Sequence, residues 1–152
     1  MHLVTYLSLL REAEGALASS YRTVGDGHAA EADVRQISAL LARQCETHAQ
    51  ALTPAIDRYR EDRETEPDRT YPTALGPARS GGLGLLRDLH DLYALCSFVD
   101  ITWTLVGQGA KGRRDSELLD VVTGCEAETA IQLAWLTTRM KAAAPQALLL
   151  AR

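Results

Sequence analysis

Part of this chain occurs twice. The sequence Val-Gly-Asp-Gly at residues 24–27 is followed by Cys-Glu-Thr-His at 45–48, and Val-Gly-Gln-Gly at 106–109 is followed by Cys-Glu-Ala-Glu at 125–128. The first pair of segments is offset by 82 residues and the second by 80, so a two-residue gap aligns both. Because paired glycines favour turns, each copy predicts two helices joined near its V-G-x-G segment. Two such hairpins make a four-helix bundle.

Length and composition predict a single domain over residues 1–152. Hydrophobic residues make up 46% of the chain, which is enough to bury one core. Helix formers such as Ala, Leu, Glu, Gln and Arg are frequent, whereas aromatic residues, which favour strands, make up only 5%. We therefore expect an all-α four-helix bundle built from two duplicated helical hairpins that a long crossover joins.

Charge and hydropathy limit the expected partners. A formal net charge of -4 and a pI near 5.5 give no field that attracts phosphates, so nucleic acid is not expected. No apolar run reaches the roughly 18 residues of a membrane span, and residues 1–10 lack a basic leader with a cleavage site. Three cysteines cannot all pair within one chain, which fits a reducing compartment. The expectation is a cytoplasmic protein without membrane contact, and association into a homodimer stays open.

Apolar residues at alternating spacings of three and four predict the helices. Leu3, Leu7 and Leu10 begin such a stripe, which continues through Leu17 and Tyr21. The expected helices cover residues 3–24, 31–60, 83–108 and 115–143.

The chain also predicts where these helices begin and end. Pro54 should kink or end the second helix, and Pro145 should limit the fourth. Ser80 is the expected N-cap of the third helix, and Asp115 or Ser116 that of the fourth.

Residues 61–82 are expected to form the crossover. This segment is charged at first and then interrupted by Pro67, Pro72 and Pro77. A connection of this length is needed when the second and third helices run parallel, because the chain must return along the whole bundle.

Several chemically distinctive residues fall on the inward stripes at mid-height, where we expect them to share one layer. A thiol and an imidazole three residues apart lie on one helical face, as do a thiol and a carboxylate in the fourth helix. The candidate metal ligands are Glu14, Cys45, His48, Cys96, Cys125 and Glu128.

With two hairpins, a long crossover and inward polar residues, the chain resembles the ferritin-like superfamily. The resemblance implies a di-iron centre with one Glu from each of the first and third helices and a Glu-x-x-His from each of the others. This chain has no Glu-x-x-His. Glu14 matches the first carboxylate and His48 the second-helix imidazole, but Cys45, Cys96 and Cys125 stand where the family has Glu. A standard di-iron centre is therefore not expected.

Two functional hypotheses follow, and whether the chain is an enzyme stays open. In the first, thiolates and one imidazole bind a different transition metal, such as Zn(II) or Cu(I), or act in thiol redox chemistry. In the second, the cysteines are small buried hydrophobes and the bundle is a non-catalytic structural or interaction protein without metal. Helices three and four or the apolar tail would then form an interface. A small-molecule enzyme is a third alternative.

Glu14 needs a partner, because an unpaired carboxylate in an apolar stripe costs several kcal/mol. Arg43, Arg11 or a slight rotation of the helix are the expected explanations, and Tyr21 or Trp103 are the available donors.

Two further clusters contain a histidine beside acidic residues. His28 and Glu31 form either a surface metal pair or, as we favour, a capped helix start. His90 with Asp88 and Asp91 could act as an acid–base group, but on a helix such a trio more often lies on a solvated face.

Overall fold

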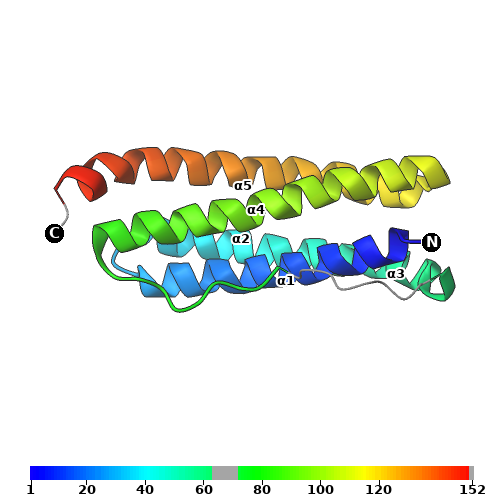
Figure 1. The fold of residues 1–152 in the computed structure, drawn as a ribbon, viewed down its shortest axis with the longest axis horizontal. Helices are drawn as coiled ribbons and strands as arrows, with labels where there is room; N and C mark the ends of the chain where they lie inside the picture. The colour runs from blue at the N-terminus through cyan, green and yellow to red at the C-terminus, as the bar shows by residue number, and fades with distance from the viewer. Residues whose placement is uncertain (63–71, 151–152) are drawn as a thin grey trace.

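The computed structural model describes residues 1–62 and 72–150, and this part of the chain forms an all-α four-helix bundle, as predicted (Figure 1). The four long helices are α1 (Leu3–Gly27), α2 (Ala32–Ala51), α4 (Gly81–Arg113) and α5 (Ser116–Leu149). A short helix α3 (Thr53–Arg58) and a 3-10 turn η1 (Arg60–Asp62) follow α2.

The helices pair as two antiparallel hairpins. α1 packs along α2 and α4 packs along α5, while α1 also lies against α4 and so joins the hairpins. α2 and α4 run in the same direction, so the chain returns along the bundle between them (Figure 1). Much of the expected crossover, residues 63–71, lies outside the described residues. The part that follows, residues 72–80, has no regular secondary structure and contacts α1, where the Leu75 amide donates to Ser20 Oγ at 3.0 Å.

The first hairpin joins directly after its V-G-x-G segment, as predicted, but both segments are helical and the second lies inside α4, which corrects their interpretation as turns. α1 runs through Gly25 to Gly27, and Gly107 and Gly109 lie inside α4. These glycines instead allow close packing between helices. A Cβ at Gly25 would approach Ser38 Cβ to 3.0 Å, and one at Gly107 would approach Val122 Cγ1 to 3.1 Å. The hairpin of α4 and α5 turns later, at residues 114–115.

The proline predictions had mixed outcomes. Pro54 stands in the first turn of α3, directly after α2 ends, as expected. Pro145 does not end α5, which continues to Leu149. Pro145 is exposed, so water can bind the carbonyl that loses its helical partner, and the alanines around it favour the helix.

The helix caps were also partly predicted. Asp115 caps α5, because its side chain accepts the Leu118 amide at 3.0 Å. Arg58 and the Tyr59 hydroxyl donate to the same carboxylate at 2.9 and 2.8 Å, which ties α3 to the start of α5. Ser80 occupies the N-cap of α4, but its side chain makes no capping hydrogen bond.

The core runs the length of the bundle and is built mainly from leucines, with two large aromatic side chains among them. The largest fully buried apolar side chains are Tyr21, Trp103, Leu7, Leu10, Leu17, Leu52, Leu89, Leu92, Leu118 and Leu136.

None of the helices within the described ranges is both long and apolar enough to span a membrane.

Candidate functional site

Glu14 lies on α1 in the middle of this core and is completely buried. Its Oε1 atom accepts the indole N–H of Trp103 at 2.8 Å and lies 3.0 Å from His48 Nδ1. The partners expected from the sequence, Arg43 and Arg11, are both exposed, so that expectation was wrong. Trp103 was correctly named as a donor.

His48 stands between two carboxylates. Its Nδ1 faces Glu14, and its Nε2 lies 3.6 Å from Glu128 Oε2 on α5. Trp103 packs edge-on against the ring, with centroids 6.1 Å apart. Because an ionised carboxylate can only accept hydrogen bonds, the hydrogen of this bond is on Nδ1, which donates to Glu14. In the neutral ring, Nε2 is then a free acceptor that faces Glu128.

The neighbouring carboxylates also affect the charge of His48. Burial alone would lower the pKa of His48, but the hydrogen bond and charge of Glu14 and the charge of Glu128 raise it above the ordinary value. The ring therefore binds a proton readily at Nε2.

Two buried atoms of this pair have no hydrogen-bond partner within residues 1–62 and 72–150. They are Glu14 Oε2 and His48 Nε2, whose 3.6 Å separation from Glu128 is too long for a hydrogen bond. Buried polar atoms without partners are rare in folded proteins, and each indicates a bound water or ion or a functional constraint.

A second buried group adjoins the first and centres on Gln132 of α5. Gln132 is fully buried, and its Oε1 accepts the Tyr21 hydroxyl at 3.0 Å and the thiols of Cys45 and Cys96 at 3.7 Å each. Its Nε2 donates to Gln44 Oε1 at 2.7 Å. No sequence pattern had singled out Gln132. Both ends of its carboxamide are engaged.

The three thiols are free and buried. Burial, reinforced by the charge of Glu14, raises the pKa of Cys45 far above the ordinary range. Burial likewise raises the pKa of Cys96 to about 12 and, together with the charges of Glu14 and Glu128, that of Cys125 to about 12. All three are therefore protonated at neutral pH, and a metal ion would have to displace the proton of any thiol that it binds.

Hydrogen bonds and ion pairs gather Glu14, His48 and Glu128 in one group, while Cys45 and Cys96 contact Gln132. Cys45 joins the two groups, because a hydrogen bond and the charge of Glu14 also raise the pKa of its thiol. Cys125 is linked to the first group by the charges of Glu14 and Glu128, which raise the pKa of its thiol. In α4, Trp103 and Cys96 are seven residues apart, which separates them by about 10 Å along the axis. Nowhere in the described part of the chain do three His, Cys, Asp or Glu side chains already surround a point where a metal ion would sit.

His28 and Asp88 form a third buried polar contact, at the C-terminal end of α1. His28 Nε2 lies 2.7 Å from Asp88 Oδ2, and Arg79 donates to Asp88 through its backbone N–H and its guanidinium. His28 thus forms no surface metal pair with Glu31. The favoured alternative, a capped helix start, is partly right, because Glu31 occupies the N-cap of α2 but its side chain makes no capping hydrogen bond. Asp88 does not lie on a solvated face, which corrects that expectation. His90 is exposed, as expected. Residues 28 and 88 are too far apart in sequence for spacing to reveal the contact.

Comparison with protein-family models, curated proteins and solved structures finds no match. The fold and the site therefore define the class. The protein is an all-α four-helix bundle with a buried carboxylate–histidine pair that faces a second carboxylate.

Proposed function

We propose that this chain is a divergent ferritin-like bundle that binds one transition-metal ion at His48 and Glu128. The ferritin-like assignment is supported by the paired hairpins and by the parallel direction of α2 and α4, which requires a long crossover. The observation that carries the metal proposal is the buried, unpartnered Nε2 of His48, which faces a carboxylate.

In this proposal Glu14 orients the imidazole rather than binding the metal. Histidines that bind metals donate their other ring N–H to a carboxylate or carbonyl, which fixes the tautomer and strengthens the ligand. Glu14 stands in that position on Nδ1, and the Trp103 indole holds the same Glu14 oxygen. This differs from the family pattern, in which the first-helix carboxylate is itself a ligand.

Cys125 is the proposed third ligand. It lies three residues before Glu128 on α5, so both side chains leave the helix on one face. The charges of Glu14 and Glu128 both raise the pKa of its thiol, which supports this choice. One nitrogen, one oxygen and one sulfur ligand suit Zn(II), with water completing a tetrahedron.

Glu128 also provides a route for the ion. Its side chain is 47% exposed, whereas His48 is 2% exposed, so Glu128 connects the buried nitrogen to solvent. A metal ion must displace the proton from Nε2 and from the Cys125 thiol, so binding should weaken as the pH falls.

Equilibrium dialysis of the purified protein against Zn(II), followed by metal analysis, tests the proposal. We expect one ion per chain in the wild type and in the controls His90→Ala and Cys96→Ser, which change an exposed histidine and a thiol outside the site. His48→Ala and Glu128→Gln should lose the ion while staying helical by circular dichroism. Binding that persists in both variants, or its absence from folded wild-type protein, would overturn the proposal.

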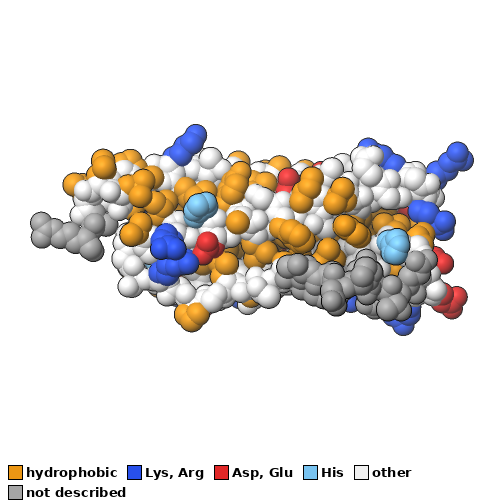
Figure 2. All heavy atoms as spheres, viewed as in Figure 1, with side chains coloured by type: hydrophobic (Ala, Val, Ile, Leu, Met, Phe, Trp, Pro, Cys, Tyr) orange, Lys and Arg blue, Asp and Glu red, His pale blue; other side chains and the backbone are white. Residues whose placement is uncertain are grey.

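A non-catalytic interaction bundle is the second candidate, and one surface favours it. Tyr6, Ile101 and Leu105 are 40%, 52% and 49% exposed, and a hollow of about 290 Å³ lies between the start of α1 and the end of α4. Apolar side chains gather on this face (Figure 2). The hollow has no Asp, Glu, Lys or Arg in its lining, so two copies could meet there without like-charge repulsion.

The proposed occupant of this surface is a second copy of the chain. Sedimentation of the wild type should then show a dimer that Leu105→Glu converts to a monomer, and a monomeric wild type would contradict it. A cytoplasmic location stays part of this proposal, because reducing conditions keep the three cysteines as free thiols.

A further inference from the structure

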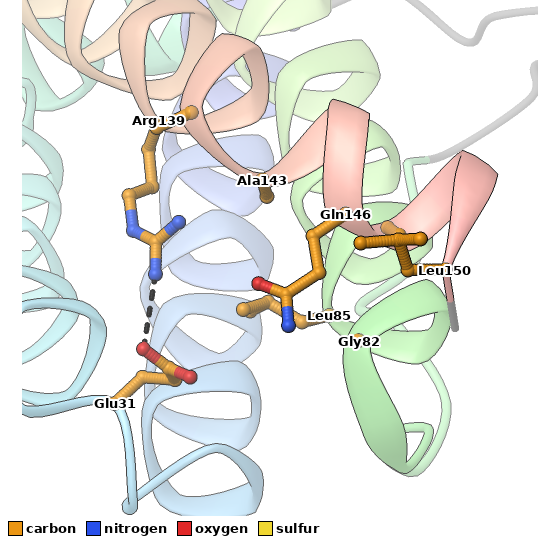
Figure 3. A pocket seen from close by; sticks show the side chains of 9 residues that line it. Glu31, Gly82, Leu85, Arg139, Ala143, Gln146 and Leu150 are labelled. Atoms are coloured by element: carbon orange, nitrogen blue, oxygen red, sulfur yellow. Dashed lines mark hydrogen bonds and ion pairs between the residues drawn. The ribbon is translucent and has the colours of Figure 1, made fainter. Parts of the chain in front are cut away.

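A pocket of about 350 Å³ lies at the end of the bundle where α5 ends and α4 begins. Its lining comes from the end of α5, the first turns of α4 and the residue before α2 (Figure 3). Small side chains make the space, because Ala142, Ala143 and Ala147 stand on the α5 wall. Its volume falls within the range of small-molecule sites.

Opposite charges stand side by side in this pocket. Arg139 descends from α5 and Glu31 faces it from below (Figure 3), with Arg139 Nη2 3.1 Å from Glu31 Oε2. Arg139 Nε also donates to Asp33 at 2.7 Å. These contacts engage two of the five guanidinium N–H groups, so three stay available. The Arg139 side chain is only 16% exposed, whereas Glu31 is half exposed.

The remaining lining combines one amide with apolar walls. Gln146 extends into the space from α5, close to Leu85 of α4 (Figure 3). Among the residues that the structure describes, the Gln146 carboxamide has no hydrogen-bond partner. Leu85, Ala147 and Leu150 supply the apolar surface.

We propose that this pocket binds a small zwitterion, namely a free α-amino acid with an aliphatic side chain. Its carboxylate would accept from the free N–H groups of Arg139, and its ammonium would donate to Glu31. In an α-amino acid these two charges are neighbours, as Arg139 and Glu31 are. The aliphatic side chain would lie against Leu85 and Leu150.

The charge balance favours a zwitterion over a simple ion. Glu31 and Asp33 together outweigh Arg139 by one negative charge, which disfavours a lone carboxylate or phosphate. A lone ammonium bound to Glu31 would be repelled by the neighbouring Arg139 guanidinium. Only a ligand with both charges satisfies both sides.

Thermal unfolding with millimolar leucine, N-acetyl-leucine and leucinamide tests this inference, because the three probes share a side chain and differ in charge. A ligand that binds the folded state raises the melting temperature. We expect leucine alone to raise it. Equal shifts with N-acetyl-leucine or leucinamide would overturn the zwitterion assignment, and no shift with leucine would overturn the site.

Two variants locate the effect. Ala143→Leu fills the pocket and should abolish the leucine shift, whereas Ala134→Leu, on the exposed part of α5 outside the pocket, should preserve it. Arg139→Gln should also abolish the shift, but it removes a contact between α5 and the start of α2. Ala143→Leu therefore decides the outcome if Arg139→Gln unfolds. A leucine shift that survives Ala143→Leu would place binding elsewhere.

Discussion

The two buried polar groups at mid-bundle differ in how completely they are satisfied. The Gln132 group is neutral, and both ends of its carboxamide are engaged. The Glu14 group carries the charge, holds two buried atoms without partners in the described chain, and reaches the surface through Glu128. A buried network whose members are satisfied serves packing, whereas unmatched polar atoms point to a ligand. The thiols alone therefore do not mark the site.

Removing Glu14 should have the largest effect. Glu14→Ala leaves His48 Nδ1 and the Trp103 indole N–H buried without an acceptor. Breaking a buried charged pair costs about 3–5 kcal/mol, and we expect that loss in the free energy of unfolding measured with urea. A loss below about 1 kcal/mol would mean that the Glu14 group is not a strongly coupled pair.

Asp88 is a second buried carboxylate within the described residues, and unlike Glu14 it has both oxygens engaged. Burial alone would raise the pKa of Asp88, but hydrogen bonds from His28 and Arg79 lower it. Its contribution to stability is then complete above the unfolded pKa near 3.9 and is lost as the pH falls through the lower folded pKa.

Asp88→Asn should therefore cost about 2–3 kcal/mol at pH 7 and flatten the decline of stability in acid. Urea unfolding of wild type and variant from pH 7 to 3 measures both effects. A constant difference over that range would contradict the assigned contacts.

Gln132→Leu should cost less than either change. It leaves the Tyr21 hydroxyl without its acceptor and the Gln44 side-chain oxygen without its donor, which costs about 1–2 kcal/mol. Metal binding should be unchanged, because Gln132 hydrogen-bonds to neither His48 nor Glu128. If this variant lost both stability and metal, the two groups would act as one unit.

The smallest effect should come from an exposed pair that joins the same two helices as Glu14 and His48. Arg22 on α1 lies 2.7 Å from Glu46 on α2, but both side chains are about half exposed. Exposed ion pairs contribute about 0–1 kcal/mol, so Arg22→Ala should lower the free energy of unfolding by no more than that. A loss matching that of Glu14→Ala would remove the contrast between buried and exposed pairs.

The sequence was sufficient to predict the helices and much of the burial. Apolar spacing placed Glu14 and His48 inside, and the proline-rich crossover implied a parallel α2 and α4. It did not pair Glu14 with His48, because the register between α1 and α2 depends on the turn at residues 28–31. The actual partner lies more than one helical turn beyond Arg43.

Other contacts had no sequence signal. Gln132 of α5 hydrogen-bonds to side chains from the three other long helices, and only packing brings these to one height. The sequence also could not show the role of the V-G-x-G repeat, because glycine allows close contacts between helices as well as turns. In α4 the packing demand prevailed, and the helix continued through both glycines.

The absorption spectrum of the Co(II)-loaded protein identifies the side chains that bind the metal, because Co(II) replaces Zn(II) and its spectrum depends on its ligands. We expect one equivalent of tetrahedral Co(II) with a thiolate charge-transfer band that Cys125→Ser removes and Cys96→Ser preserves. His48→Ala should abolish binding. A spectrum that depends on Cys96 but not on Cys125, or that is unchanged in His48→Ala, would contradict the assignment of the site to the Glu14 group.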